Sequence, residues 1–210
     1  MTPILVLAMF AIFAILDYFI HHRRKQPAKT KTEVPDEIPE ALAKALRAVS
    51  IDGVAIPEEL RFHPGHTWAY EERQHLHRVG IDELAARMAG PIEKIELPQP
   101  GRWVRQGQKA WAFYANGQKY EMVSPAEGEV MAVNPEVVKD PSLIHQDPYG
   151  RGWLMTVSVP DDENVGRNLL PPALVSAWMR DSIHKLQSHP PAQGEGSMPT
   201  AEVVHELLLT

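Results

Sequence analysis

The sequence predicts a mainly β domain that is flanked by helices and preceded by one N-terminal transmembrane helix. Three observations support this prediction. Short runs of β-type residues, separated by turn residues, fill positions 61–160, an unbroken apolar run occupies positions 3–20, and a helical apolar pattern covers positions 173–186. A chain of 210 residues has room for one ordinary globular domain with appendages.

The composition excludes several classes of function. A formal net charge of -6 and a pI near 5.9 provide no basic surface for phosphate backbones, so we expect no nucleic-acid partner. The absence of cysteine excludes disulfides, thiolate metal sites and cysteine nucleophiles. His63, His66, His75 and His77 lack a cysteine or closely spaced carboxylate to complete a ligand set, so we expect no metal site. No catalytic motif is visible, so an enzyme is not expected.

The apolar run at residues 3–20 predicts a membrane anchor. It carries one charge, Asp17, and as a helix it would span about 27 Å. Basic residues follow the run at positions 21–25 instead of preceding it, which indicates an uncleaved anchor with the N-terminus outside and the following domain on the cytoplasmic side of the cell membrane. Asp17 either reaches the interface near this basic flank or makes a polar contact with another membrane helix.

The rest of the chain divides by composition. We expect an anchor with a basic flank at 1–25, a tether and short amphipathic helix at 26–60, a β domain at 61–160, a C-terminal helix at 161–187 and a flexible tail with a short amphipathic helix at 188–210. The β runs lie at 77–81, 92–97, 109–115, 118–124, 128–134 and 153–159. A helix at 82–88 interrupts them, with Asp82 and Glu83 as capping residues and Gly90-Pro91 as its stop.

Several motifs occur in the order and spacing of one known family. HTW at 66–68, VGID at 79–82 and GPIEKIELPQPG at 90–101 resemble HEW, VGIT and GDIVFVELPEVG of glycine cleavage system H proteins. Farther on, SPAEGEVMAVN at 124–134 resembles APVSGEVVEVN, and DPSLIHQDPYGRGWL at 140–154 resembles DSPELVNSDPYGEGWL. The resemblance implies a flattened β-barrel or sandwich of two small sheets, a barrel-sandwich hybrid, with a C-terminal helix.

The resemblance also implies a lipoate-carrying lysine, which this chain lacks at the corresponding position. In the family that lysine stands at a hairpin tip. When this sequence is aligned with the family motif without gaps, forward from Gly107 or backward from Gly128, Gly117 occupies the position of the lysine. Asn116-Gly117 between two β runs predicts a type I′ hairpin, in which both central residues have positive φ. Lys119 would then lie opposite Tyr114, about 7 Å below the tip, as the remaining candidate lipoate acceptor.

These observations favour a non-catalytic, membrane-anchored accessory subunit of a respiratory or photosynthetic complex, built on an H-protein fold without a cofactor. Its expected partners are integral membrane protein subunits and the lipid bilayer. The alternative is a membrane-held lipoyl carrier, modified at Lys119 and acting in glycine, one-carbon or sulfur metabolism. A third interpretation is an apo-fold that binds lipoyl ligase or glycine cleavage proteins and regulates them by competition.

Overall fold

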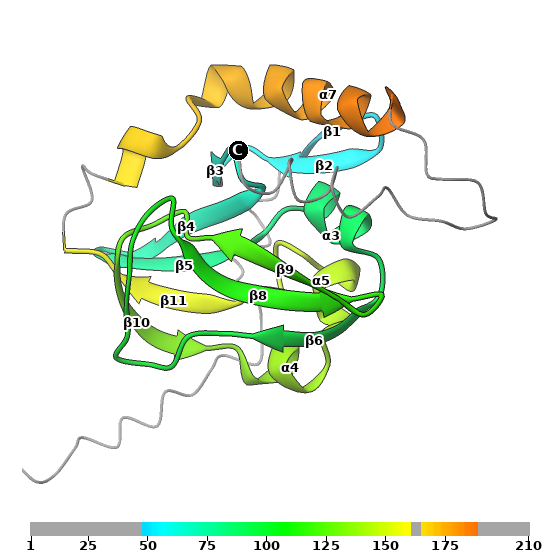
Figure 1. The fold of residues 1–210 in the computed structure, drawn as a ribbon. Coiled ribbons are helices and arrows are strands. Elements are labelled where there is room, and N and C mark those ends of the chain that lie inside the picture. Colours follow the sequence, from blue (N-terminus) through cyan, green and yellow to red (C-terminus); the bar gives the residue numbers. More distant parts are fainter. Residues whose placement is uncertain (1–47, 161–164, 189–210) are drawn as a thin grey trace, which may run out of the picture. The chain divides into compact units, whose positions relative to one another are not determined.

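The structure is a computed structural model that describes residues 48–160 and 165–188. The predicted span at 3–20, with Asp17, and the tail after residue 188, with its predicted short amphipathic helix, lie outside the described residues. Within the described ranges, no helix has the length and apolar character that a membrane crossing requires. The described part is mainly β, as the sequence predicts (Figure 1).

The first element is a separate hairpin of β1 (Ala48–Ile51) and β2 (Val54–Pro57). Its turn, Asp52-Gly53, has φ values of 49° and 80°. Asp-Gly is one of the dipeptides that favour a two-residue hairpin turn, because both positions must adopt positive φ. This hairpin occupies part of the stretch for which the composition predicts a tether and a short helix.

Six strands form the larger sheet, in the order β3-β4-β5-β11-β10-β7. They are β3 (Arg61–His63), β4 (Thr67–Arg73), β5 (Leu76–Ile81), β7 (Trp103–Val104), β10 (Gly128–Val133) and β11 (Met155–Ser158). Strand β11 pairs antiparallel with both β5 and β10, so segments far apart in the sequence lie side by side. Val79 and Met155 face each other in this pairing, and both are fully buried. Burial of such apolar pairs is the main stabilising contribution of the sheet.

A smaller sheet contains β6 (Ile92–Glu96), β8 (Lys109–Ala115) and β9 (Gln118–Val123), in the order β6-β8-β9 (Figure 1). Phe113 is paired with Ile95 on one side and with Tyr120 on the other. The Phe113 and Tyr120 rings stack with centroids 5.1 Å apart. All three side chains are buried, so one face of this sheet belongs to the core and the opposite face carries the candidate site.

Two of the predicted helices fall within the described residues, and both are present. Helix α3 (Glu83–Ala89) begins after Asp82, whose side chain accepts a hydrogen bond from Ala85 N at 2.7 Å, and ends at Gly90 with φ 64°. Asp82 is therefore the N-cap that the sequence predicts. Helix α7 (Pro172–Ser188) covers the helical apolar pattern at 173–186 and lies along β1 (Figure 1). The remaining helices are α4 (Pro135–Lys139), α5 (Leu143–Gln146) and the 3-10 helix η1 (Gly166–Asn168).

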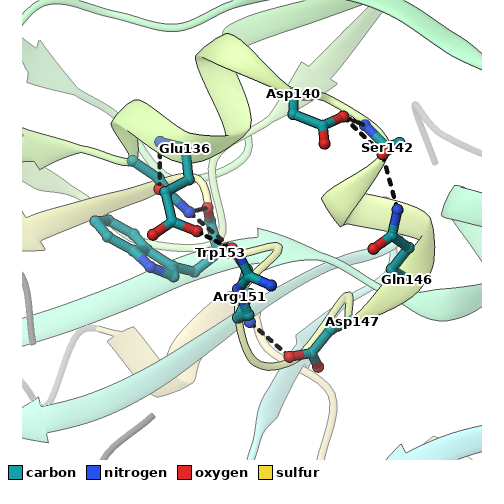
Figure 2. Close-up of polar contacts among 8 residues, drawn as sticks. Glu136, Asp140, Ser142, Gln146, Asp147, Arg151 and Trp153 are labelled. Atoms are coloured by element: carbon teal, nitrogen blue, oxygen red, sulfur yellow. Dashed lines mark hydrogen bonds and ion pairs between the residues drawn. The ribbon is translucent and has the colours of Figure 1, made fainter. Parts of the chain in front are cut away.

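The DPYGRGWL motif at 147–154 is a tightly bonded loop (Figure 2). Asp147 accepts hydrogen bonds from the backbone N–H groups of Gly150 and Arg151, at 2.9 and 2.8 Å. A Cβ at Gly150 would collide with the Asp147 carboxylate, so a larger residue here would displace that carboxylate from its two hydrogen bonds. Arg151 pairs with Glu136 of α4 at 2.8 Å, and the loop ends where Leu154 N donates to Val79 O. The motif thus has a structural function, because it delivers β11 to the edge of β5.

Trp103 is 49% exposed on β7, which is unusual for so large an apolar side chain. Its strand makes only a two-residue pairing with β10, in which Trp103 faces Glu129. Trp111 and Trp153 are buried, as expected for core anchors. Trp103 differs from them in that β7 is the edge strand of the larger sheet, so it has a neighbouring strand on one side only.

Candidate functional site

The tip of the β8–β9 hairpin is the position at which the resemblance implies a modified lysine. Asn116 and Gly117 have φ values of 52° and 71°, and Ala115 pairs with Gln118, which is the register expected from the sequence. Apart from Gly117 and its two chain neighbours, no described atom lies within 4 Å of where a Gly117 Cβ would stand. The tip is therefore open to solvent and presents an amide side chain and a bare Cα, but no amine.

Lys119 lies two residues beyond the tip and pairs with Tyr114 across the ladder. Its side chain is 46% exposed, and Nζ lies 3.3 Å from Glu96 Oε2. Nζ also lies 5.8 Å from the centroid of the Tyr114 ring. This distance allows a weak attraction between the ammonium and the face of the ring. The amine of Lys119 is thus accessible, but it is held along the sheet face instead of extending from the tip.

Glu96 binds a second ammonium group at the same time. Lys94 Nζ donates to Glu96 Oε1 at 2.7 Å and lies 5.0 Å from the Tyr114 ring centroid. The hydrogen bond from Lys94 is the main reason why the pKa of Glu96 is lowered to about 2, and Lys119 contributes to the same shift. The carboxylate in turn raises the pKa of both lysines, chiefly through these hydrogen bonds. We call Lys94, Glu96, Lys119 and Tyr114 the two-lysine cluster.

Strand geometry explains why the cluster forms. Lys94 and Glu96 are two residues apart on β6 and so project from the same face. Lys94 pairs with Tyr114, and Tyr114 pairs with Lys119, which aligns three side chains across three strands. An irregularity in the β6–β8 pairing between Ile92 and Lys94 sets this register. A bulge of this kind cannot be located from the sequence, so Lys94 and Glu96 were not predicted as site residues.

A groove of about 240 Å³ lies next to the cluster on the outer face of the smaller sheet. Ala110 and Ala112 of β8 line it between the charged side chains of Glu96, Lys119 and Glu121. Lys109, also at this groove, donates to Glu121 at 2.6 Å. The surface beside Lys119 is therefore polar and alternates in charge, and the two alanines leave room above the strand.

The histidines lie elsewhere and have structural contacts. His66 is fully buried, its Nδ1 lies 2.7 Å from Asp82 Oδ2, and its ring stacks on Trp178 of α7 with centroids 4.6 Å apart. His63 is also buried and accepts a hydrogen bond from Gly65 N. In residues 48–160 and 165–188, no three side chains of the metal-binding types come together.

Comparison with known proteins agrees with the motifs and the fold. The family model described as "Glycine cleavage H-protein" matches residues 60–181, more than half of the chain. The chain belongs to the glycine cleavage H-protein family. It is 33% identical over 130 residues to a probable glycine cleavage system H protein 2 of Sulfurisphaera tokodaii, covering 60% of this chain and 88% of that protein. It is 36% identical over 109 residues to a glycine cleavage system H protein of Thermobifida fusca, covering 52% and 86%.

A solved structure supports the same assignment. The crystal structure of a glycine cleavage system H protein from Mycobacterium marinum superposes with a TM-score of 0.52 at 28% sequence identity. The match covers 60% of this chain and 98% of that one. The predicted mainly β, barrel-sandwich fold with flanking helices is thereby confirmed for the described residues.

The family assignment corrects three predictions. The accessory subunit of a respiratory or photosynthetic membrane complex is wrong, because the family model and the relatives are those of the glycine cleavage system. For the same reason, integral membrane subunits and the lipid bilayer are not supported as partners. The location in the cell membrane is also contradicted by these relatives, and the described helices include none that could span a bilayer. An apolar N-terminal run and a missing tip lysine do not outweigh a match over the whole β domain.

The family's cofactor, lipoate, has to be tested against the residues present. At the tip they do not fit, since Gly117 offers no nitrogen for an amide bond. At Lys119 they do fit, because a primary amine with a half-exposed side chain lies on the same hairpin, two residues away. The amine nearest the tip of this hairpin is therefore that of Lys119, and its position is not the one implied by the resemblance.

Proposed function

We propose that this protein is a lipoyl carrier of the glycine cleavage type, and that Lys119 Nζ is the amine that takes the lipoyl group. The carrier function would reside in the β domain at residues 61–160, and its partners would be the other proteins of a glycine cleavage system. The protein itself would be a carrier within an enzyme system and not a catalyst.

The observation that supports this proposal most directly is the position of Lys119 on the β8–β9 hairpin. A lysine side chain on this hairpin offers the nucleophile that amide formation requires, and 46% exposure leaves it within reach of a ligase. A shift of two residues along a strand keeps a side chain on the same face of the sheet. The side chain of Lys119 would therefore lie on the same face of the hairpin as a side chain at position 117.

Attachment would join the amine to an activated carboxyl group. Lys119 Nζ loses a proton and, as a neutral amine, attacks the carbonyl carbon of a nucleotide-activated lipoate; the C–N amide bond forms, the C–O bond to the nucleotide breaks, and the nucleotide and the second amine proton leave. The attached group would supply a disulfide at the end of a long arm, which can take up and release a reaction intermediate. The chain contributes the amine, the rigid hairpin that presents it and the open surface around it.

Intact mass measurement tests the proposal. The full-length chain, expressed in cells that lipoylate their own carriers, should show the mass increase of one lipoyl amide, and peptide mapping should place it at Lys119. Lys119→Arg should remove the increase, because it keeps the charge and loses the acylatable amine. Lys94→Arg is the matched control, since Lys94 lies in the same cluster, and it should keep the modification. A mass equal to the unmodified chain, or a modification that persists in Lys119→Arg, would refute the proposal.

A second candidate function is supported by the tip itself. Asn116-Gly117 is a well-formed turn without an amine, so the chain could retain the family's binding surface while remaining unmodified. Such a protein would bind lipoyl ligase or glycine cleavage proteins and compete with a modified carrier. The same mass measurement separates the two functions, because only the carrier shows the lipoyl increase. A competition assay with a lipoylated H protein would then test the second.

A further inference from the structure

We propose that Glu96 is a positioning residue that controls how readily Lys119 is acylated, and that Lys94 competes with Lys119 for the same carboxylate. The inference deepens the proposed function, since it concerns the amine to which that function assigns the lipoyl group. It rests on the contacts of the two-lysine cluster, and the reactivity of the Lys119 amine can be measured without lipoate.

The two lysines contact different oxygens of one carboxylate, at unequal distances. Lys94 Nζ lies 2.7 Å from Glu96 Oε1, whereas Lys119 Nζ lies 3.3 Å from Oε2. Both ammonium groups also approach the Tyr114 ring, Lys94 at 5.0 Å and Lys119 at 5.8 Å from the centroid. Lys94 thus makes the closer contact with both shared partners, and Lys119 makes the more distant one.

Acylation requires an unprotonated amine that can leave its ion pair. A carboxylate beside an ammonium group favours the charged form, and the pKa of Lys119 is raised for this reason, with the hydrogen bond to Glu96 as the leading cause. Glu96 therefore lowers the fraction of Lys119 that can react and also directs Nζ along the sheet. Exposed ion pairs are weak, so the control is graded and does not act as an on-off switch.

Competition by Lys94 predicts opposite effects for two substitutions. Glu96→Gln removes the charge that holds both lysines, so Lys119 should react faster. Lys94→Met removes the competitor, so Glu96 can turn fully to Lys119, and Lys119 should react more slowly. A general effect of surface charge gives the same two signs, because Glu96→Gln removes a negative charge and Lys94→Met removes a positive one. Glu96→Asp separates the two explanations, since it keeps the charge but shortens the side chain that reaches Lys119 Nζ, and it should also raise Lys119 labelling if the contact itself matters.

Limited acetylation of the folded, full-length chain by acetic anhydride, followed by peptide mass spectrometry, measures this reactivity directly. We expect Lys119 labelling to rise about two- to fivefold in Glu96→Gln and to fall in Lys94→Met, as weak exposed pairs imply. Asp181→Asn is the matched control. It removes the carboxylate from another exposed pair, Lys185 with Asp181 at 2.9 Å in α7, and should leave Lys119 labelling unchanged.

The outcomes separate the two proposals. Unchanged Lys119 labelling in Glu96→Gln, or an equal rise in Asp181→Asn, would overturn the positioning role. A parallel reaction with lipoate ligase should follow the same order, with Glu96→Gln modified faster than wild type. If Lys119 labelling follows the predicted order but ligase leaves the chain unmodified, the positioning role of Glu96 stands and the proposed lipoyl acceptor is wrong. If ligase modifies Lys119 at equal rates in all variants, the acceptor stands and the positioning role is wrong.

Discussion

Lys119 lies directly across the β8–β9 ladder from Tyr114, two residues beyond the Asn116-Gly117 tip, and its Nζ is within 3.3 Å of Glu96. A carrier hairpin would be expected to combine an exposed tip with a free amine, and here the two are at different positions. The open tip has no amine, and the amine that is present is held by a carboxylate. Acylation of this hairpin should therefore depend on the position of its lysine and on the ion pair that the lysine makes.

Placing a lysine at the tip should increase modification of the chain. In Gly117→Lys the added Cβ has open space beyond its two chain neighbours, although φ of 71° costs about 1 kcal/mol for a residue with a Cβ. We expect lipoate ligase to modify Lys at this position faster than Lys119 of the wild type, as measured by intact mass over time. Gln118→Lys, which adds an amine on the neighbouring position, is the control. Equal rates in wild type and Gly117→Lys would show that the place of the amine does not limit the reaction.

The turn itself should be sensitive to side-chain shape. Gly117→Val should lower the free energy of unfolding by about 1–2 kcal/mol, because a β-branched residue resists positive φ. Gly117→Asn should cost less, since asparagine adopts this conformation more readily. Urea denaturation of the full-length variants measures both. Equal stabilities for valine and asparagine would contradict the type I′ geometry.

Local features of this fold could be predicted from the sequence. Asn116-Gly117 between two β runs gives the turn and, from it, the pairing of Tyr114 with Lys119. Asp82 before an apolar helical pattern, with Gly90 after it, gives the limits of α3. In each case the information lies within about ten residues of chain, and backbone sterics or a single capping bond determines the result.

Features that depend on distant segments could not be predicted. The pairing of Val79 with Met155 joins strands more than seventy residues apart, and no local pattern specifies it. Lys94 and Glu96 became site residues only through the irregular register between β6 and β8. The Asp52-Gly53 turn was available as a signal, but its strands are four residues each, and such short runs are difficult to distinguish from a tether.

The hydroxyl of Tyr149 should contribute to stability. It donates to Ala55 O at 2.7 Å and accepts from Glu83 N at 3.0 Å, so it joins β2 to the start of α3. Tyr149→Phe leaves both backbone groups without this partner in a buried place, and we expect a loss of about 1–3 kcal/mol. Denaturant titration gives the value. Gln118→Ala, at an exposed strand position, serves as a control and should change stability far less. A neutral Tyr149→Phe would mean that solvent replaces the hydroxyl.

Stability should fall in mild acid partly because of His63. Burial lowers the pKa of His63 below 6.5, so below that pH the unfolded chain takes up a proton that the folded chain does not. The folded state therefore loses stability as the pH falls from 6.5 towards the lowered pKa. His63→Gln removes this one group, and its stability should depend less on pH over that window than that of the wild type. Parallel pH profiles of the two proteins would refute the assignment.

Asp82 should be the most sensitive polar position of the domain, because its two oxygens serve two different elements. Oδ1 accepts from Ala85 N to cap α3, and Oδ2 lies 2.7 Å from Nδ1 of His66, with both side chains fully buried. A carboxylate can only accept, so Nδ1 carries the proton of this bond. Asp82→Ala removes the cap, worth about 1 kcal/mol, and leaves the buried His66 donor unsatisfied, which costs about 1–3 kcal/mol more.

Asp82→Asn separates these two contributions. Asparagine is as good an N-cap as aspartate, so the bond to Ala85 should survive, while the amide nitrogen would face a ring nitrogen that also donates. Either His66 changes its tautomer or the amide turns and gives up one of the two bonds. We therefore expect a loss of stability between those of the wild type and Asp82→Ala, measured by urea denaturation, with the His66 ring protons shifted in NMR spectra. Equal losses in both variants would show that Asp82 acts only through its charge, and an unchanged Asp82→Asn would show that the contact with His66 contributes nothing.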